Sequence, residues 1–117
     1  MLFVHYSKCS TCKKAMNWLD GHNVEFDQRS IVEDNPTSEE LKLWHKMSDL
    51  PLRRFFNTSG MLYREQGLKD KLSSMTEDEM YELLASNGML VKRPLLVLDD
   101  TVLVGFKEAE WRAELGL

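Results

Sequence analysis

The sequence predicts a single α/β domain in which a mixed β-sheet is divided by a long helical insert. Short apolar runs typical of strands occur near both ends of the chain. Helix-start signals and apolar residues at helical spacing occupy the region from about 30 to 90. A length of 117 residues is sufficient for one hydrophobic core, so we treat 1–117 as one domain.

The beginning of the chain predicts a strand, a helix and a second strand. The apolar run over 2–6 is typical of a buried strand, and a helix over 12–19 follows it. Gly21 is expected to end this helix in a left-handed conformation. Alternating apolar and polar residues over 24–27 predict the second strand. A strand–helix–strand unit favours parallel pairing of the two strands.

The middle of the chain is predicted to be helical. Thr37 is expected to cap one helix through a capping box with Glu40, and Pro51 to start a short helix. Thr76 begins a further helix. Leu43 lies off the apolar stripe of the first of these helices, which predicts that this helix is covered on more than one side.

The end of the chain returns to strands. The runs over 94–98 and 101–104 predict an antiparallel hairpin, and a last helix over 107–115 would turn Ala109 and Trp111 inward. The complete order is β-α-β, helical insert, β-β-α. That order is typical of a thioredoxin-like fold, a mixed sheet with helices packed on it.

Composition and charge argue against several classes of protein. Apolar residues at 43% and charged residues at 29% are typical of a soluble globular domain, and no apolar run approaches the roughly 20 residues of a membrane span. A net charge of −4 argues against direct nucleic-acid binding, and Arg53 and Arg54 are interpreted as solvated surface residues. No signal peptide is recognisable, so we expect a cytoplasmic protein.

The most informative motif is Cys9-Ser10-Thr11-Cys12, which contains the only two cysteines of the chain. A separation of three residues on a first helical turn brings two Cα atoms to roughly 5–6 Å, within the range of a disulfide. The positive end of the helix dipole and its free N–H groups favour a thiolate. We therefore expect Cys9 to be more acidic than a free cysteine, with Ser10 and Thr11 as candidates for substrate contact.

Other interpretations of the cysteines are open. A structural zinc site needs four ligands, and the three histidines have no ligand-like spacing, so no metal is expected. Two inert buried cysteines are a second alternative, although the polar neighbours Ser7 and Lys8 favour exposure. A structural disulfide is disfavoured because such bonds are rare in a reducing compartment.

A second group of candidate residues is Lys92-Arg93-Pro94, at the start of the third predicted strand. In a thioredoxin-like fold, a cis-proline at this point lies against the active-site sulfur, which would bring Arg93 near Cys9. A guanidinium is always charged, favours a nearby thiolate and can hold an oxyanion through two parallel hydrogen bonds. The alternative is a surface arginine beside Lys92.

With both motifs placed, the chain resembles the arsenate reductase-like (ArsC) family, which includes the Spx- and MgsR-type regulators. The resemblance covers essentially the full length and rests on four segments, residues 6–15, 63–68, 92–95 and 104–107. It implies the thioredoxin-like fold with a helical insert that the element order also predicts.

Among the glutathione-coupled arsenate reductases of this family, the first cysteine of the loop attacks arsenate and three arginines bind the oxyanion. The resemblance places Cys9 at the attacking position and Arg93 at one arginine position. Asn57 and Phe106, followed by Lys107, stand at the other two. Because a single guanidinium neutralises much less of the charge of arsenate, efficient arsenate reduction is not expected.

The resemblance instead implies a thiol–disulfide oxidoreductase acting on a small thiol or an oxyanion. Cys12 would resolve the intermediate formed on Cys9, Arg93 would stabilise the thiolate and anchor an anionic group, and Pro94 would shape the groove. An external reductant (glutathione, glutaredoxin or thioredoxin) would restore the dithiol, and no bound cofactor is implied.

The regulator branch of the family implies a different class of function. Cys9 and Cys12 match its redox switch, and Arg93 is matched as well. A disulfide would then alter a surface that binds the RNA polymerase α subunit. Pro51 stands where these regulators have a glycine at the polymerase contact, and proline lacks an N–H and fixes φ. A retained fold without present activity is a third alternative.

Overall fold

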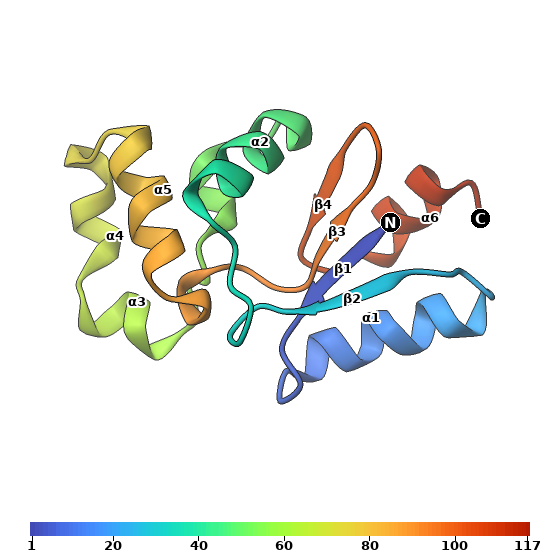
Figure 1. The fold of residues 1–117 in the computed structure, drawn as a ribbon. Helices are drawn as coiled ribbons and strands as arrows, with labels where there is room; N and C mark the ends of the chain where they lie inside the picture. Colours follow the sequence, from blue (N-terminus) through green and yellow to red (C-terminus); the bar gives the residue numbers. More distant parts are fainter.

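The computed structural model describes residues 1–117 and contains a four-stranded mixed sheet with the strand order β2-β1-β3-β4 (Figure 1). β1 (Leu2–His5) pairs in parallel with β2 (Asp27–Ser30) and antiparallel with β3 (Leu95–Val97). β3 pairs antiparallel with β4 (Val102–Val104). The thioredoxin-like layout, the parallel pair and the antiparallel hairpin are thereby confirmed.

Helices account for most of the rest of the chain. They are α1 (Ser10–Gly21), α2 (Ser38–Ser48), η1 (Leu52–Phe55), α3 (Met61–Glu65), α4 (Leu68–Lys71), η2 (Leu72–Ser74), α5 (Glu77–Ser86), η3 (Gly88–Leu90) and α6 (Glu108–Leu115), where η denotes a 3-10 helix. All except α1 and α6 lie between β2 and β3, so the helical insert is confirmed. None of the helices has the length and apolar character needed to cross a bilayer.

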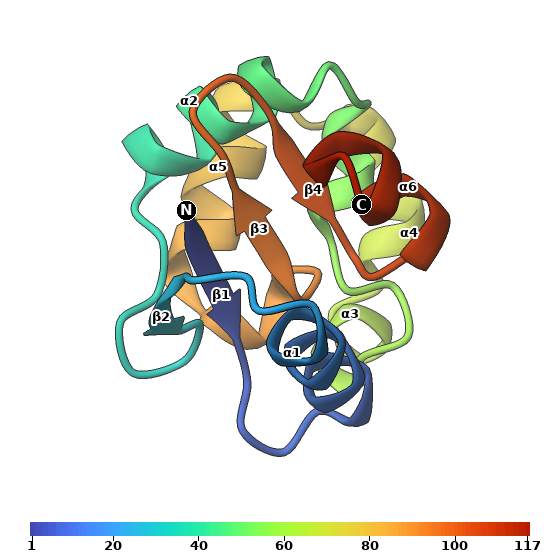
Figure 2. The same cartoon turned by 90° about the vertical axis from the view of Figure 1, so that its right-hand side faces the viewer.

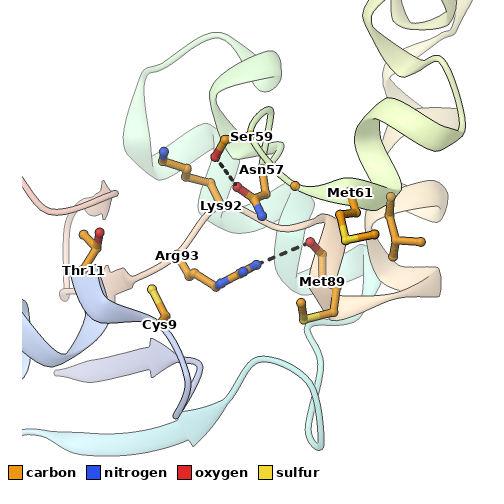
Figure 3. A pocket seen from close by; sticks show the side chains of 10 residues that line it. Cys9, Thr11, Asn57, Ser59, Met61, Met89, Lys92 and Arg93 are labelled. Atoms are coloured by element: carbon orange, nitrogen blue, oxygen red, sulfur yellow. Dashed lines mark hydrogen bonds between the residues drawn. The ribbon is translucent and has the colours of Figure 1, made fainter.

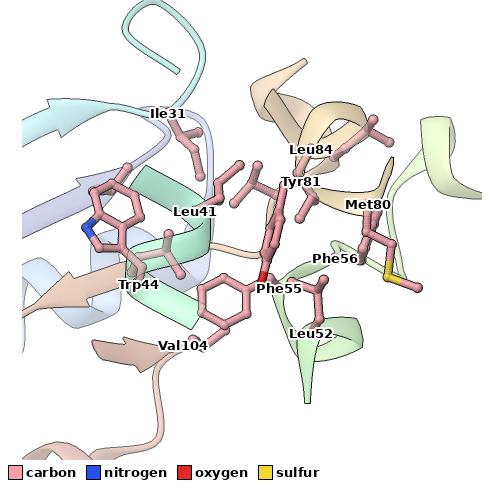
Figure 4. Close-up of a cluster of buried hydrophobic side chains, with 14 of the residues drawn as sticks. Ile31, Leu41, Trp44, Leu52, Phe55, Phe56, Met80, Tyr81, Leu84 and Val104 are labelled. Atoms are coloured by element: carbon pink, nitrogen blue, oxygen red, sulfur yellow. The ribbon is translucent and has the colours of Figure 1, made fainter. Parts of the chain in front are cut away.

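Each face of the sheet packs against its own apolar cluster, because successive strand residues point to opposite sides. Val4 and Leu95 belong to a cluster of 18 buried residues shared with the insert, including α2 and α5 (Figure 4). Their neighbours Phe3 and Leu96 belong to a cluster of six that includes Trp111. Figures 1 and 2 show α1 and α6 on the opposite side of the sheet from α2 and α5.

The first connection differs from its prediction in two places. The second strand is Asp27–Ser30, and Val24 and Phe26 pack against the smaller cluster from the loop before it. Gly21 is the last residue of α1, and the left-handed conformation falls on Asn23, with φ of 57°. Asparagine visits this region more readily than most residues because its short side chain can hydrogen-bond locally.

Two predictions of helix burial are wrong. Leu43 is 57% exposed, so α2 is covered on one side only. Ala109 is exposed on α6, whereas Trp111 faces the core as predicted. Isolated apolar side chains are common on protein surfaces, so neither position needs a partner.

The capping box at the start of α2 is confirmed and has an additional partner. The Thr37 hydroxyl accepts a hydrogen bond from the Glu40 amide, and the Glu40 carboxylate accepts one from the Thr37 amide, both at 3.1 Å. Arg29 of β2 donates two further hydrogen bonds to that carboxylate, at 2.6 and 2.8 Å. These hydrogen bonds from Arg29 lower the pKa of Glu40 to about 2 and connect the insert to the sheet.

We expect Glu40→Gln to lower the free energy of unfolding by about 1 kcal/mol at neutral pH, a modest figure because the Glu40 side chain is one-third exposed. Glutamine can keep the capping hydrogen bonds but loses the charge. Since the folded pKa of about 2 lies below the ordinary glutamate value of about 4.3, the difference from wild type should shrink as pH falls from 4.3 towards 2. Urea denaturation at several pH values measures it.

Glu79→Gln is the matched control for this prediction. Glu79 forms an equivalent capping box with Thr76 but has no arginine partner. We expect a smaller loss of stability from this variant. Equal losses from the two variants at neutral pH would show that the Arg29 ion pair contributes nothing.

Candidate active site

Cys9 lies at the point where the turn after β1 becomes helix α1. Its amide donates a hydrogen bond to the Tyr6 carbonyl at 3.1 Å. Its Sγ is the side-chain cap of the helix and accepts a hydrogen bond from the Cys12 amide at 3.3 Å. The sulfur thus fills the role that serine or aspartate usually has at an N-cap, and α1 begins at Ser10, earlier than predicted.

The two free thiols have opposite environments. Partial burial opposes ionisation of Cys9, but hydrogen bonds from the Cys12 thiol and amide, together with the charge of Arg93, outweigh it and lower the pKa of Cys9. Cys12 is 1% exposed, and burial, followed by its hydrogen bond with Cys9, raises its pKa to about 12. One sulfur is therefore prepared for ionisation while its neighbour stays protonated.

Arg93 is held beside the sulfur by contacts along its length. The Arg93–Pro94 peptide bond is cis, and the guanidinium carbon lies 5.2 Å from the centre of the Tyr6 ring. Nη1 donates a hydrogen bond to the Met89 carbonyl at 3.4 Å, while Nε is buried without a hydrogen-bond partner. Figure 3 shows the Arg93 side chain next to Cys9, with Met89 beyond it.

A cavity of about 440 Å³ opens at Cys9, and we call it the sulfur cavity (Figure 3). Thr11, Lys92 and Arg93 contribute to its wall near the sheet. The opposite wall comes entirely from the insert and contains Asn57, Ser59, Gly60, Met61, Leu62 and Met89. The site therefore lies at the junction between the sheet half of the protein and its insert.

The predicted site residues are only partly brought together at this cavity. Cys9, Thr11 and Arg93 line it. Cys12 is buried beneath Cys9, and the Pro94 carbonyl accepts a hydrogen bond from the Gly105 amide at 2.8 Å. Ser10 is exposed on α1 and does not line the cavity. No group of three or more His, Cys, Asp or Glu side chains is placed to hold a metal ion.

A model of the ArsC family matches residues 4–114 of the chain. The chain belongs to the ArsC family. It is 52% identical over 111 residues to the uncharacterized protein YusI of Bacillus subtilis (strain 168), covering 95% of this chain and 94% of that protein. The global transcriptional regulator Spx of Staphylococcus epidermidis is 29% identical over 104 residues, covering 89% of this chain and 78% of Spx.

Solved structures agree with this assignment. The crystal structure of an ArsC family related protein from Bacteroides fragilis superimposes with a TM-score of 0.93 at 56% identity, covering 96% of this chain and 94% of that chain. The fold and family predicted from the sequence are thereby confirmed.

Two positions where the resemblance to arsenate reductases expects arginine carry no charge in this ArsC protein. Asn57 is buried in the wall of the sulfur cavity, where its Oδ1 accepts a hydrogen bond from the Ser59 hydroxyl at 3.3 Å. Phe106 packs edge-on against Trp111, with ring centres 5.0 Å apart. The cations of the sulfur cavity are therefore Lys92 and Arg93.

The insert wall of the ArsC site includes residues that sequence reasoning missed. Met61 and Met89 lie in short helical segments, where a methionine usually fills gaps in a core. Met61 is 69% exposed, so it borders the opening rather than the core. The sequence signals near this wall are the turn over 57–60, which precedes α3, and the resemblance that places Asn57 at an arginine position.

We expect iodoacetamide to alkylate Cys9 with a pH profile whose midpoint lies below the free-thiol pKa of about 8.5. Cys12 should stay unmodified at pH values where Cys9 reacts, because it is buried and its pKa is raised to about 12. Arg93→Gln should move the Cys9 midpoint upward, since it removes a positive charge beside the thiolate. Peptide mass spectrometry measures both sites.

A Cys9 midpoint at or above the free-thiol value would contradict this expectation. Lys14→Gln is the control for Arg93→Gln, because Lys14 is an exposed cation of α1 that does not line the sulfur cavity. In Lys14→Gln, the midpoint of Cys9 alkylation should equal that of the wild type.

Proposed function

We propose that this ArsC-family protein is a thiol–disulfide oxidoreductase with Cys9 as the nucleophile and Cys12 as the resolving cysteine. The observation that carries the proposal is the opposite protonation preference of two free thiols three residues apart. A nucleophile must be a thiolate to attack, whereas a resolving thiol must not compete with it. The Arg93 charge beside Cys9 supports the same assignment.

The first step is attack by the Cys9 thiolate on one sulfur of a disulfide, RS–SR. The S–S bond breaks, RS⁻ leaves, and Cys9 becomes joined to R in a mixed disulfide. Arg93 favours the thiolate before attack and faces the anionic groups of the substrate. The attack takes place in the sulfur cavity, the recess into which Cys9 is exposed.

The second step is attack by Cys12 on the Cys9 sulfur. Burial is the largest cause of the raised pKa of Cys12, but the hydrogen bond and charge of Cys9 contribute to it. That contribution disappears once Cys9 is in a mixed disulfide, so Cys12 gives up its proton more easily then. The Cys12 proton passes to the solvent, the Cys9–Cys12 disulfide forms and a second RS⁻ leaves. This step is intramolecular and has a high effective concentration.

Regeneration requires an external reductant, which we assign to glutathione, glutaredoxin or thioredoxin. Two electrons from this donor return both cysteines to thiols. The cycle needs the dithiol form to persist, so we place the protein in the reducing cytoplasm. With uncharged Asn57 and Phe106 at two arginine positions, we expect arsenate to be a poor substrate.

A panel of reductase assays tests this function. Arsenate, glutathione mixed disulfides and protein disulfides are offered to the full chain, each with the glutathione and the thioredoxin systems as donors. We expect turnover with disulfides and rates near background with arsenate. No turnover with any disulfide under either donor would overturn the proposal.

A second candidate function is redox-controlled binding to RNA polymerase, which the resemblance to the regulator branch of the family implies. The similarity to the global transcriptional regulator Spx over 89% of this chain favours it, as do two free thiols three residues apart, of which Cys9 is partly exposed. Pro51 weighs against it: this residue is exposed at the start of η1 with φ of −59°, and a proline has no N–H to offer at the position that the resemblance assigns to the polymerase contact.

Affinity capture with the C-terminal domain of the polymerase α subunit separates the two functions. The chain is presented in its reduced and in its oxidised state. Binding that depends on redox state, combined with no disulfide turnover, would favour the regulator. The absence of binding in both states would eliminate it.

A further inference from the structure

The short helix η3 supplies a carbonyl that holds the side chain of Arg93. Its middle residue, Met89, accepts the hydrogen bond from Nη1 of Arg93, which a dashed line marks in Figure 3. At 3.4 Å this hydrogen bond is long, so a small further displacement of the Met89 carbonyl would break it. The position of Arg93 beside Cys9 therefore depends on what fixes η3.

The first residue of η3 packs directly against the loop that follows β2. A Cβ atom at Gly88 would lie 2.7 Å from the Ile31 carbonyl carbon and closer still to its oxygen, and it would be 3.2 Å from the Asn35 Cβ. No side chain fits at such separations, so only glycine allows the two backbones to approach in this way. Ile31 is fully buried, and its amide donates a hydrogen bond to the His5 carbonyl of β1 at 2.9 Å. Gly88 thus places η3 against a segment that the sheet holds.

Asn35 connects the same loop to the helix that precedes η3. Its Nδ2 donates a hydrogen bond to the Ala85 carbonyl at 2.6 Å, across 50 residues of sequence. Ala85 lies in the last turn of α5, where carbonyls have no partner within the helix. Arg29 fixes the loop from its other side by donating to the Asp34 carbonyl at 2.8 Å and to the Asn35 carbonyl at 3.2 Å. Asn35 therefore anchors the end of α5 from which the chain enters η3.

The other ionisable groups around Cys9 are held by different parts of the chain. Cys12 lies in α1, and Tyr6 lies in the turn before that helix. Lys92 lines the sulfur cavity, and its amide donates a hydrogen bond to a carbonyl of η1 at 2.7 Å. Arg93 is the member of this group whose charged end is bonded to η3. A displacement of η3 should therefore reach the sulfur through Arg93.

We propose that Gly88 and Asn35 are positioning residues, which hold η3 where it fixes the Arg93 guanidinium beside the reactive sulfur. The inference rests on the proposed oxidoreductase function, in which this sulfur is the nucleophile. Neither residue lines the sulfur cavity, so both act on the sulfur from outside it. When η3 moves, the guanidinium loses its hydrogen bond and its charge stays near the thiolate for less of the time.

The experiment measures the pH midpoint of Cys9 alkylation by iodoacetamide in the full chain. Asn35→Ala should raise this midpoint by about half a pH unit, the change expected when a unit charge about 6 Å away in water is withdrawn. Gly88→Ala should raise it by at least as much, because the added methyl group displaces η3 directly. If Gly88→Ala fails to fold, Asn35→Ala decides the question.

A double variant that combines Asn35→Ala with Arg93→Gln tests whether the effect passes through the guanidinium. Substitutions that act through one shared group are not additive. We expect the midpoint of Cys9 alkylation in the double variant to equal that in Arg93→Gln alone. A full additional rise in the double variant would overturn the proposal.

Thr76→Ala is the control for a general loss of stability. The Thr76 hydroxyl accepts a hydrogen bond from the Glu79 amide at 3.1 Å, so this variant loosens α5 at the end remote from η3. Gly21→Ala is the control for the added methyl group, because a Cβ at Gly21 would contact no neighbouring segment within 4 Å. Both controls should keep the wild-type midpoint of Cys9 alkylation. A rise in Thr76→Ala equal to that in Asn35→Ala would overturn the proposal.

This inference and the proposed function can fail separately, because alkylation does not require turnover. Wild-type midpoints in Asn35→Ala and Gly88→Ala would overturn the positioning role and leave the oxidoreductase standing. Midpoints that rise as expected, in a protein that reduces no disulfide, would overturn the oxidoreductase and leave the positioning role standing.

Discussion

Cys9→Ser should abolish disulfide reduction, because a hydroxyl is not ionised near neutral pH and cannot form a disulfide. We expect the turnover rate to fall by about 10³-fold or more, as for loss of other catalytic nucleophiles. Serine is a favoured N-cap residue, so its hydroxyl can accept the Cys12 amide hydrogen bond that Sγ accepts at 3.3 Å. Helix α1 should remain intact, and circular dichroism with thermal unfolding can verify this.

Cys12→Ser is the partner variant and should have a different effect. The first attack needs only Cys9, so the mixed disulfide should form and accumulate, visible as a mass increase equal to R. Continued turnover with glutathione would indicate a monothiol cycle. Retained activity in Cys9→Ser, or failure of Cys12→Ser to form any mixed disulfide, would contradict the assigned roles.

Trp111→Ala should cause the largest loss of stability, about 3–5 kcal/mol in urea denaturation. The side chain is fully buried, and its Nε1 donates a hydrogen bond to the Gly105 carbonyl at 3.0 Å. Its ring centre lies 6.4 Å from those of Phe3 and Trp18 and 5.0 Å from that of Phe106. Small domains are stable by only about 5–15 kcal/mol, so this is a large share.

Trp111→Phe separates the two contributions of this side chain. Phenylalanine keeps most of the aromatic packing but leaves the Gly105 carbonyl without its donor, so we expect an intermediate loss. A loss below about 1 kcal/mol for Trp111→Ala would show that the six-residue cluster is not a cooperative part of the core.

The order of the elements could be predicted because the spacing of apolar residues and the residues that cap helices agree with the fold along most of the chain. The capping box predicted at Thr37 forms, and the helix predicted to begin at Thr76 does so with a capping box of its own. The second strand could not be placed, because Asp27–Ser30 is polar and lies at the sheet edge. Val24 and Phe26 alternate like a strand only because both bury against the smaller cluster from a loop.

The residues at the centre of the candidate site, Cys9 and Arg93, could be predicted from the sequence. Most of the residues that line the cavity around them could not. Cys9 could be recognised by its motif, and Arg93 could be placed beside it only through the fold. The sequence predicts Arg54 to be a solvated surface residue, and it is exposed, yet it also lines a cavity of about 300 Å³ together with Lys92 and Arg93. The residues that line this cavity come from η1, from the segment just before β3 and from the end of β4. Because they are far apart in the sequence, only the folded structure shows that they are neighbours.

The division of the sulfur cavity between two parts of the chain has an evolutionary consequence. The reactive group belongs to the β1–α1 junction, while most of the surface opposite it comes from the turn over 57–60 and the start of α3. Changes over 57–62 can therefore retune which molecules are accepted without altering the acidity of the nucleophile. Family members could diversify their targets by exchanging this one short stretch, and a chimaera carrying it would inherit the donor's preference.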